Sequence, residues 1–157
     1  MFKNKIVKDI LTGVSVPIFG FILLNLTFIF DFLFQSSILA VIKLFTPVDF
    51  QKNFHWFPPI MHGSFVIIIG IISRFVFKSK LKTFYKAIYL TVPLAVVFVS
   101  LGMSFYQTPL VSFLLSSIIT FSLFYFFYRT KKPWLYYYVL ILVSLTMAIS
   151  SLMGLEI

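Results

Sequence analysis

The chain has no cysteine and few acidic residues, with four Asp or Glu against 13 Lys or Arg in 157 residues. Without cysteine it forms no disulfide and has no thiolate nucleophile or ligand. Cysteine usage therefore gives no indication of its redox compartment. It also has no Gly-rich phosphate loop, no GxSxG and no HExxH. These absences argue against catalysis without excluding it, and they lead us to expect no cofactor.

Apolar residues are abundant instead. Hydrophobic residues make up 61% of the chain and charged residues only 11%, whereas a soluble domain is nearer half apolar and a quarter charged. A chain of this kind needs lipid as its solvent. The net charge of +9 could indicate nucleic-acid binding. The basic residues, however, stand in short clusters beside apolar segments, as membrane topology requires. We therefore expect a multi-pass protein of the cell membrane, surrounded by membrane lipids and with no nucleic-acid partner.

The apolar segments predict one all-α transmembrane domain over residues 1–157. About 20 apolar residues in a helix cross a hydrocarbon core of about 30 Å. Backbone groups in lipid must pair within their own segment, and the alternation of a membrane barrel is absent, so these segments are predicted to be helices. Five segments qualify, at residues 10–34, 57–77, 84–105, 109–128 and 134–154. The first is too long for a signal peptide and is expected to be retained.

The basic residues predict the orientation of this bundle. If the N-terminus is cytoplasmic, every Lys and Arg except Lys43 and Lys52 falls on the cytoplasmic side. The positive-inside rule favours that arrangement. Five crossings then place the C-terminus outside. The connection between the first two spans contains residues 36–45, which are apolar but too short to cross. They predict a separate short helix in the outer interface, capped by a serine and stopped by Pro47.

Ionisable groups inside a span are functional candidates, because they are costly there. Asp31, in FIFDFLF, is the sharpest of them. Its expected partners lie on the same side of the membrane: Lys43, Lys52, His55 and His62. One interpretation is a structural pair that ties the first helix to the outer loop. The other is a binding site for a proton, a cation or a substrate.

Three further residues complete the predicted binding site. His55 and His62 flank a Trp and two prolines where the second span begins, and Asn25 is the amide placed deepest in the first span. Asn25 could join helices or line a cavity, and both interpretations remain open. Asp31, Asp49, His55 and His62 together offer two carboxylates and two imidazoles, a workable set for zinc. Their spacing matches no known metal motif, so metal binding rests on the residue types alone.

Three functions remain open from the sequence. The favoured one is binding or passage of a small solute, ion or lipid through an outward-opening cavity, with Asp31 and His62 as its polar determinants. The second is an enzyme that modifies a lipid or prenyl substrate at the outer leaflet with its His and Asp groups. The third is a non-catalytic accessory or immunity protein that binds another membrane protein. Since five short helices enclose little space, the favoured function suggests a homo-oligomer or a membrane-protein partner.

Overall fold

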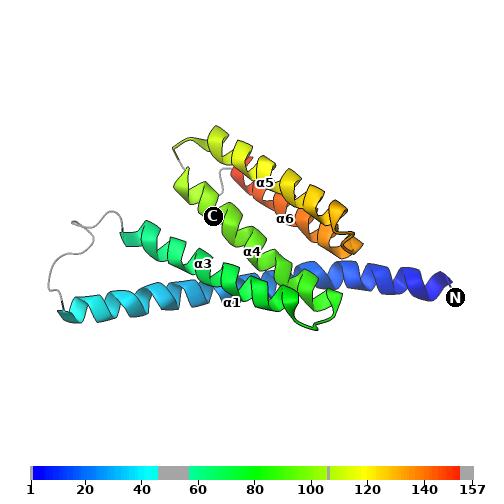
Figure 1. The fold of residues 1–157 in the computed structure, drawn as a ribbon, viewed down its shortest axis with the longest axis horizontal. Helices are drawn as coiled ribbons and strands as arrows, with labels where there is room; N and C mark the ends of the chain where they lie inside the picture. Colours follow the sequence, from blue (N-terminus) through cyan, green and yellow to red (C-terminus); the bar gives the residue numbers. More distant parts are fainter. Residues whose placement is uncertain (1, 46–56, 106, 153–157) are drawn as a thin grey trace.

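The computed structural model describes residues 2–45, 57–105 and 107–152, and these ranges contain five α-helices and no strand (Figure 1). The helices are α1 (Phe2–Phe45), α3 (Phe57–Lys78), α4 (Thr83–Ser104), α5 (Pro109–Arg129) and α6 (Trp134–Leu152). The predicted all-α bundle is confirmed. At the second span, α3 begins at Phe57, and Pro58 and Pro59 fall in its first turn, where a missing N–H costs nothing.

Four of the helices are long and apolar enough to cross a membrane, over Val7–Phe45, Ile60–Lys78, Thr83–Ser104 and Pro109–Arg129. The bundle also exposes many large apolar side chains, such as Phe30 at 70% and Phe121 at 75%. Such surfaces are unfavourable in water and ordinary in lipid. The protein is therefore a multi-pass membrane protein. The apolar stretch Trp134–Ser150 of α6 is shorter than the other four, so the fifth crossing stays a prediction.

Residues 36–45 are helical, as predicted, but they do not form a separate helix. They continue α1, which runs unbroken for 44 residues. The polar residues at the expected break bond within α1 itself. Gln35 Nε2 donates to Asp31 Oδ1 at 2.9 Å, and Ser37 Oγ donates to the Leu33 carbonyl at 2.7 Å. Because a serine that bonds back to its own helix does not cap a new one, the chain continues as α1 through this point.

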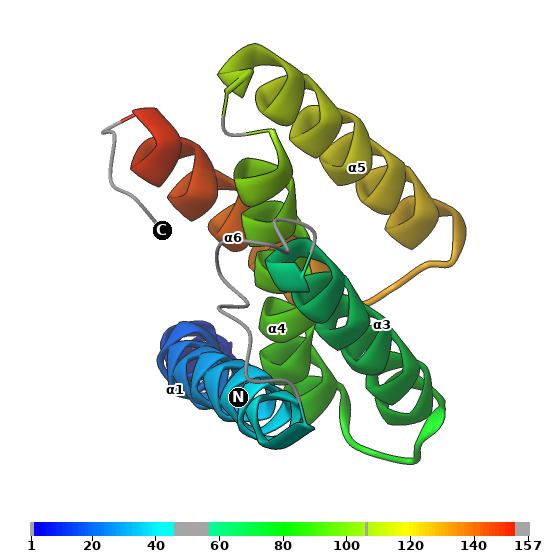
Figure 2. The same cartoon turned by 90° about the vertical axis from the view of Figure 1, so that its left-hand side faces the viewer.

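Helix α4 is the centre of the bundle and packs against all four other helices (Figure 2). Half of its apolar stretch is buried, against 6% of that of α5. The main core joins α4 to α6, with Val16 of α1 and Phe127 of α5 added to it. A smaller core joins Phe65 and Ile69 of α3 to Val92 and Val96 of α4. The remaining faces, α5 above all, are free to meet lipid.

Two close contacts hold α1 in this bundle. Gly20 lies against Thr91 of α4 so closely that a Cβ added to it would be 2.6 Å from Thr91 Oγ1. In its first half, α1 contains Pro17, which has no N–H to offer the Gly13 carbonyl one turn earlier. The Tyr138 hydroxyl of α6 donates to that carbonyl at 3.0 Å. A backbone acceptor that the proline leaves free is thus satisfied by a neighbouring helix, as lipid surroundings require.

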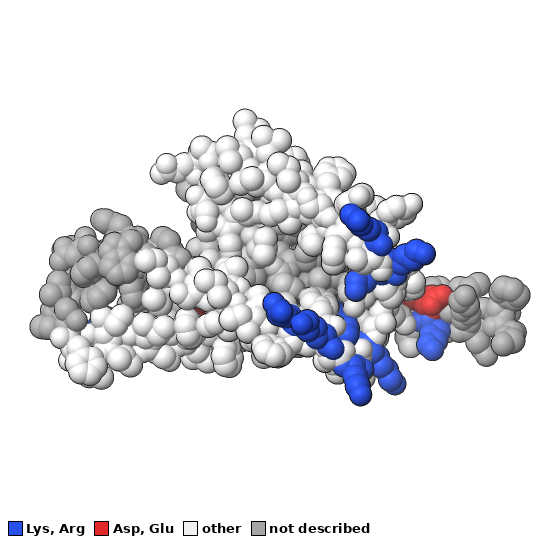
Figure 3. Space-filling model, viewed as in Figure 1, with Lys and Arg blue, Asp and Glu red and all other residues white. Residues whose placement is uncertain are grey.

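Basic side chains gather at one end of the molecule, around the α3–α4 and α5–α6 turns and the first part of α1 (Figure 3). One of them has a structural role. Lys86 Nζ donates to the carbonyls of Phe77 and Ser79, at 2.8 and 2.7 Å. An ammonium group at the C-terminal end of a helix satisfies free carbonyls and complements the helix dipole. Lys86 therefore caps α3 at the end that the positive-inside rule predicts to be cytoplasmic.

Candidate functional site

The candidate site is built around Asp31 and His62, the two residues predicted as polar determinants. Asp31 Oδ2 of α1 lies 3.4 Å from His62 Nδ1 of α3, and their side chains are 9% and 14% exposed. This distance is typical of an ion pair and longer than a good hydrogen bond. Two bare acceptors are unfavourable at that separation, so at least one of the two atoms carries a proton.

Two polar side chains extend this pair at opposite ends. Gln35, one turn after Asp31 on α1, donates to Asp31 Oδ1 at 2.9 Å. On the other side of the imidazole, His62 Nε2 lies 2.9 Å from Ser100 Oγ of α4. Ser100 Oγ also donates to the Val96 carbonyl at 2.6 Å. One continuous polar chain therefore runs from α1 through α3 to the backbone of α4.

The lengths of the helices bring these groups to one level. His62 comes about one and a half turns after the start of α3, and Ser100 about one turn before the end of α4. These two helix ends lie at the same end of the bundle, opposite the basic end (Figure 1). On the side toward the basic end, the network borders the smaller core, where Phe65 and Val96 are buried and Phe34 packs against them. Apolar side chains thus close the site on the side that faces the basic end of the bundle.

Asp31 and His62 are the predicted site residues that the structure brings together. Asn25 is not part of the network: it lies on the exposed face of α1 and donates to the Phe21 carbonyl at 2.8 Å. His55 and Asp49 lie outside the described residues, as does Lys52. Lys43 is exposed at the last turn of α1, about three turns beyond Asp31.

Metal binding finds no support in the part of the chain that is described. Those residues contain no group of three or more His, Cys, Asp or Glu side chains placed to hold an ion. Asp31 and His62 supply one carboxylate and one imidazole, whereas a zinc site uses at least three protein ligands. The remaining members of the predicted set, Asp49 and His55, are outside the described residues.

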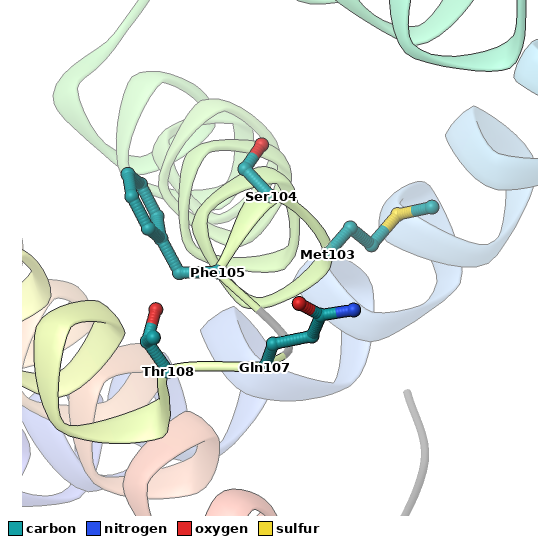
Figure 4. Close-up of a pocket in the computed structure, with 5 residues that line it drawn as sticks. All are labelled: Met103, Ser104, Phe105, Gln107 and Thr108. Atoms are coloured by element: carbon teal, nitrogen blue, oxygen red, sulfur yellow. The ribbon is translucent and has the colours of Figure 1, made fainter. Parts of the chain in front are cut away.

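An open pocket lies near this end of the bundle, at the turn between α4 and α5 (Figure 4). It is lined by Met103, Ser104, Phe105, Gln107 and Thr108. Neither Asp31 nor His62 lines it, and neither does Ser100. The pocket is therefore separate from the polar network, and it is not the cavity around Asp31 and His62 that the sequence suggested.

Sequence reasoning missed Ser100 and Gln35. The chain is rich in hydroxyls, and many of those described bond back to their own helix, as Ser64 does to Ile60 and Ser117 to Phe113. Two signals could have found the missing members. Ser100 lies one turn inside the predicted end of its span, at the depth of Asp31 and His62. Gln35 stands four residues after Asp31, the spacing at which helical side chains meet.

Comparison of the chain with protein-family models, with curated proteins and with solved structures gives no match.

Proposed function

We propose that this membrane protein binds a small cation at the Asp31–His62 pair and passes it across the cell membrane. The observation that carries the proposal is the 3.4 Å contact between these two side chains, both largely buried and contributed by different helices. A carboxylate and an imidazole are costly inside a span, and cation or proton pathways are a recurrent reason for such groups to be there. The positive-inside rule gives the site an outward position, since it lies away from the basic end.

The surroundings of the pair support a cation as the ligand. Asp31 contributes a carboxylate, a His62 nitrogen without a proton offers an acceptor lone pair, and the Ser100 oxygen offers one when its proton points elsewhere. Within the described ranges, no Lys or Arg forms an ion pair with Asp31. The salt-bridge partner of Asp31 there is His62. Among the described residues, the groups that face the Asp31 carboxylate are therefore His62 and the neutral Gln35.

Flux into liposomes tests this proposal directly. Purified protein, reconstituted with a pH-sensitive or cation-sensitive dye inside, should carry ions down an imposed gradient. The Asp31→Asn variant removes the charge while keeping the size, and its flux should fall to that of protein-free liposomes. Asp9→Asn is the matched control, because Asp9 lies on the exposed face of α1 near its N-terminal end and should keep wild-type flux. Wild-type flux in a folded Asp31→Asn variant would contradict the proposal.

The order of the groups favours a second candidate, a serine-dependent acyl transferase acting on lipid at the outer leaflet. Carboxylate, imidazole and hydroxyl follow one another as in a nucleophilic triad, with His62 Nε2 at 2.9 Å from Ser100 Oγ. Two features count against it. Ser100 Oγ donates to the Val96 carbonyl, and the backbone N–H groups inside α4 are used by the helix and offer no oxyanion hole. A fluorophosphonate probe that labels wild type and spares Ser100→Ala would favour this enzyme.

A further inference from the structure

The hydroxyl of Ser100 faces two possible acceptors and has one proton to give. Its oxygen lies 2.6 Å from the Val96 carbonyl and 2.9 Å from His62 Nε2. The carbonyl can only accept, while the imidazole nitrogen accepts when bare and donates when protonated. The two contacts are therefore linked. When Ser100 donates to Val96, Nε2 must carry a proton, and when Nε2 is bare the hydroxyl proton must point to it instead.

We infer that the ion bound at Asp31–His62 is the proton, and that Ser100 is the switch that transmits its arrival to the backbone of α4. This inference rests on the proposed function, since it names the ion at the same site. In the loaded state, His62 Nε2–H donates to Ser100 Oγ and the Ser100 hydroxyl donates to the Val96 carbonyl. In the empty state, the proton has left Nε2 for water, and the Ser100 hydroxyl turns toward Nε2.

The other nitrogen of the ring supports this assignment. Nδ1 faces Asp31 Oδ2 at 3.4 Å, where a bare nitrogen would oppose a carboxylate. Asp31 thus holds a proton on Nδ1 in the empty state, and Nε2 is the position that gains and loses one. Of the elements that pack here, α1 presents Asp31 with neutral Gln35 beside it. The titratable side chains of α4, which are Tyr85, Lys86 and Tyr89, lie near its opposite end.

The consequence for α4 is a change at one carbonyl. In the helix, Val96 O already accepts the backbone N–H of residue 100, so a second bond from the Ser100 hydroxyl makes it doubly bonded. Loss of the proton removes that second bond. Helix α4 contacts every other helix of the bundle. A hydrogen bond gained or lost on α4 therefore changes the helix against which all the others pack.

Nuclear magnetic resonance on the full chain in detergent or lipid nanodiscs tests the switch. The two ring ¹⁵N shifts of His62, followed over a pH series, report which ring nitrogen carries a proton, and we expect the neutral ring to keep its proton on Nδ1. His55→Gln assigns the resonances, since the chain has two histidines. The ¹³C shift of the Val96 carbonyl should change together with the ring shifts of His62 over that series, with the same midpoint.

Variants separate the switch from a general effect of pH. Ser100→Ala should abolish the pH response of the Val96 carbonyl, and Ser100→Thr, which keeps a hydroxyl, should retain it. Ser117→Ala is the matched control, because Ser117 donates to the Phe113 carbonyl of α5 with the same spacing at 2.9 Å. It should leave the Val96 response intact. The measurement on wild type stands alone if a variant does not fold.

Two results would overturn the switch. One is a Val96 carbonyl ¹³C shift that stays constant while the ring shifts of His62 change with pH. The other is a neutral His62 with its proton on Nε2. The outcome is independent of the flux assay. If Asp31→Asn abolishes flux while Val96 does not respond, the proposed function stands and the switch is wrong. If His62 and Val96 titrate together in a protein that passes no ions, the proton switch stands and the proposed function fails.

Discussion

At the residue scale, Tyr138 shows how one side chain makes a proline acceptable inside a membrane helix. Pro17 leaves the Gly13 carbonyl without its usual N–H donor, and the Tyr138 hydroxyl supplies a donor at 3.0 Å. The bond joins α1 to α6, two helices with little other contact. It therefore satisfies the backbone and fixes the position of α1 at the same time.

We expect Tyr138→Phe to lower the free energy of unfolding by about 1 kcal/mol, because the Gly13 carbonyl then has no donor in an apolar setting. Thermal unfolding in a defined detergent measures the loss. Tyr137→Phe is the control on the same helix, since the structure gives its hydroxyl no hydrogen bond with the described residues, and it should cost much less.

A second background makes this test specific. Pro17→Ala restores an N–H that can bond the Gly13 carbonyl within α1. In that background, Tyr138→Phe should cost clearly less than it does in wild type, which a double-mutant cycle would report as coupling between the two positions. Equal costs in the two backgrounds would mean that the tyrosine stabilises the fold through packing alone.

The candidate site was partly predictable from the sequence. Asp31 and His62 could be found because an ionisable group among apolar residues stands out wherever it occurs. The contact between them could only be suggested, because the rotation of each helix about its axis decides which of its faces packs against a neighbouring helix. Ser100 could not be distinguished from the other hydroxyls, because hydropathy treats a serine in a network and a serine bonded to its own helix alike.

At the scale of elements, the crossing of α1 and α4 depends on the missing side chain of Gly20. A Cβ there would lie 2.6 Å from Thr91 Oγ1, 3.2 Å from its Cβ and 3.3 Å from its Cγ2. Rotation of the threonine cannot relieve all three contacts. The Thr91 hydroxyl is buried and has no hydrogen-bond partner among the described residues, so this contact is formed by packing.

Gly20→Ala should therefore push α1 away from α4 and lower the free energy of unfolding by about 1–3 kcal/mol. Thermal unfolding, followed by circular dichroism, gives the measurement. Gly70→Ala is the matched control, since a Cβ at Gly70 meets nothing within 4 Å. Combining Gly20→Ala with Thr91→Ala removes Thr91 Oγ1 and Cγ2 and should recover part of the loss. Equal stability of the Gly20 and Gly70 variants would show that the two helices adjust freely.

The helices themselves were largely predictable from the sequence, because the apolar length of each segment sets its limits. The continuity of α1 was not. Gln35, Ser36 and Ser37 look like a break in an apolar run, and a serine there is compatible with a helix start. Whether it starts a new helix or bonds back to the old one depends on the backbone geometry, which the residue type does not determine.

At the scale of the whole molecule, the collection of basic residues at one end predicts a fixed orientation (Figure 3). Because the chain has no cysteine, single cysteines report it without background. We expect Gln107→Cys, in the α4–α5 turn, to react with a membrane-impermeant maleimide in intact cells. Lys80→Cys, in the α3–α4 turn, should react only after the membrane is opened. Both positions are exposed, and the reverse pattern would mean that the site faces the cytoplasm.

The unbroken length of α1 makes a demand on the bilayer itself. Its candidate membrane-spanning part, Val7–Phe45, has 39 residues and few charges, and it is about 58 Å long, nearly twice a hydrocarbon thickness of about 30 Å. To hide that length by tilting alone, the helix would have to lean by about 60°, beyond the 0–40° found for transmembrane helices. The mismatch must be absorbed elsewhere. Either the bilayer thickens along α1, or one end of the helix extends beyond the hydrocarbon. In the second case, the apolar side chains of that end must be covered by other protein or lipid groups.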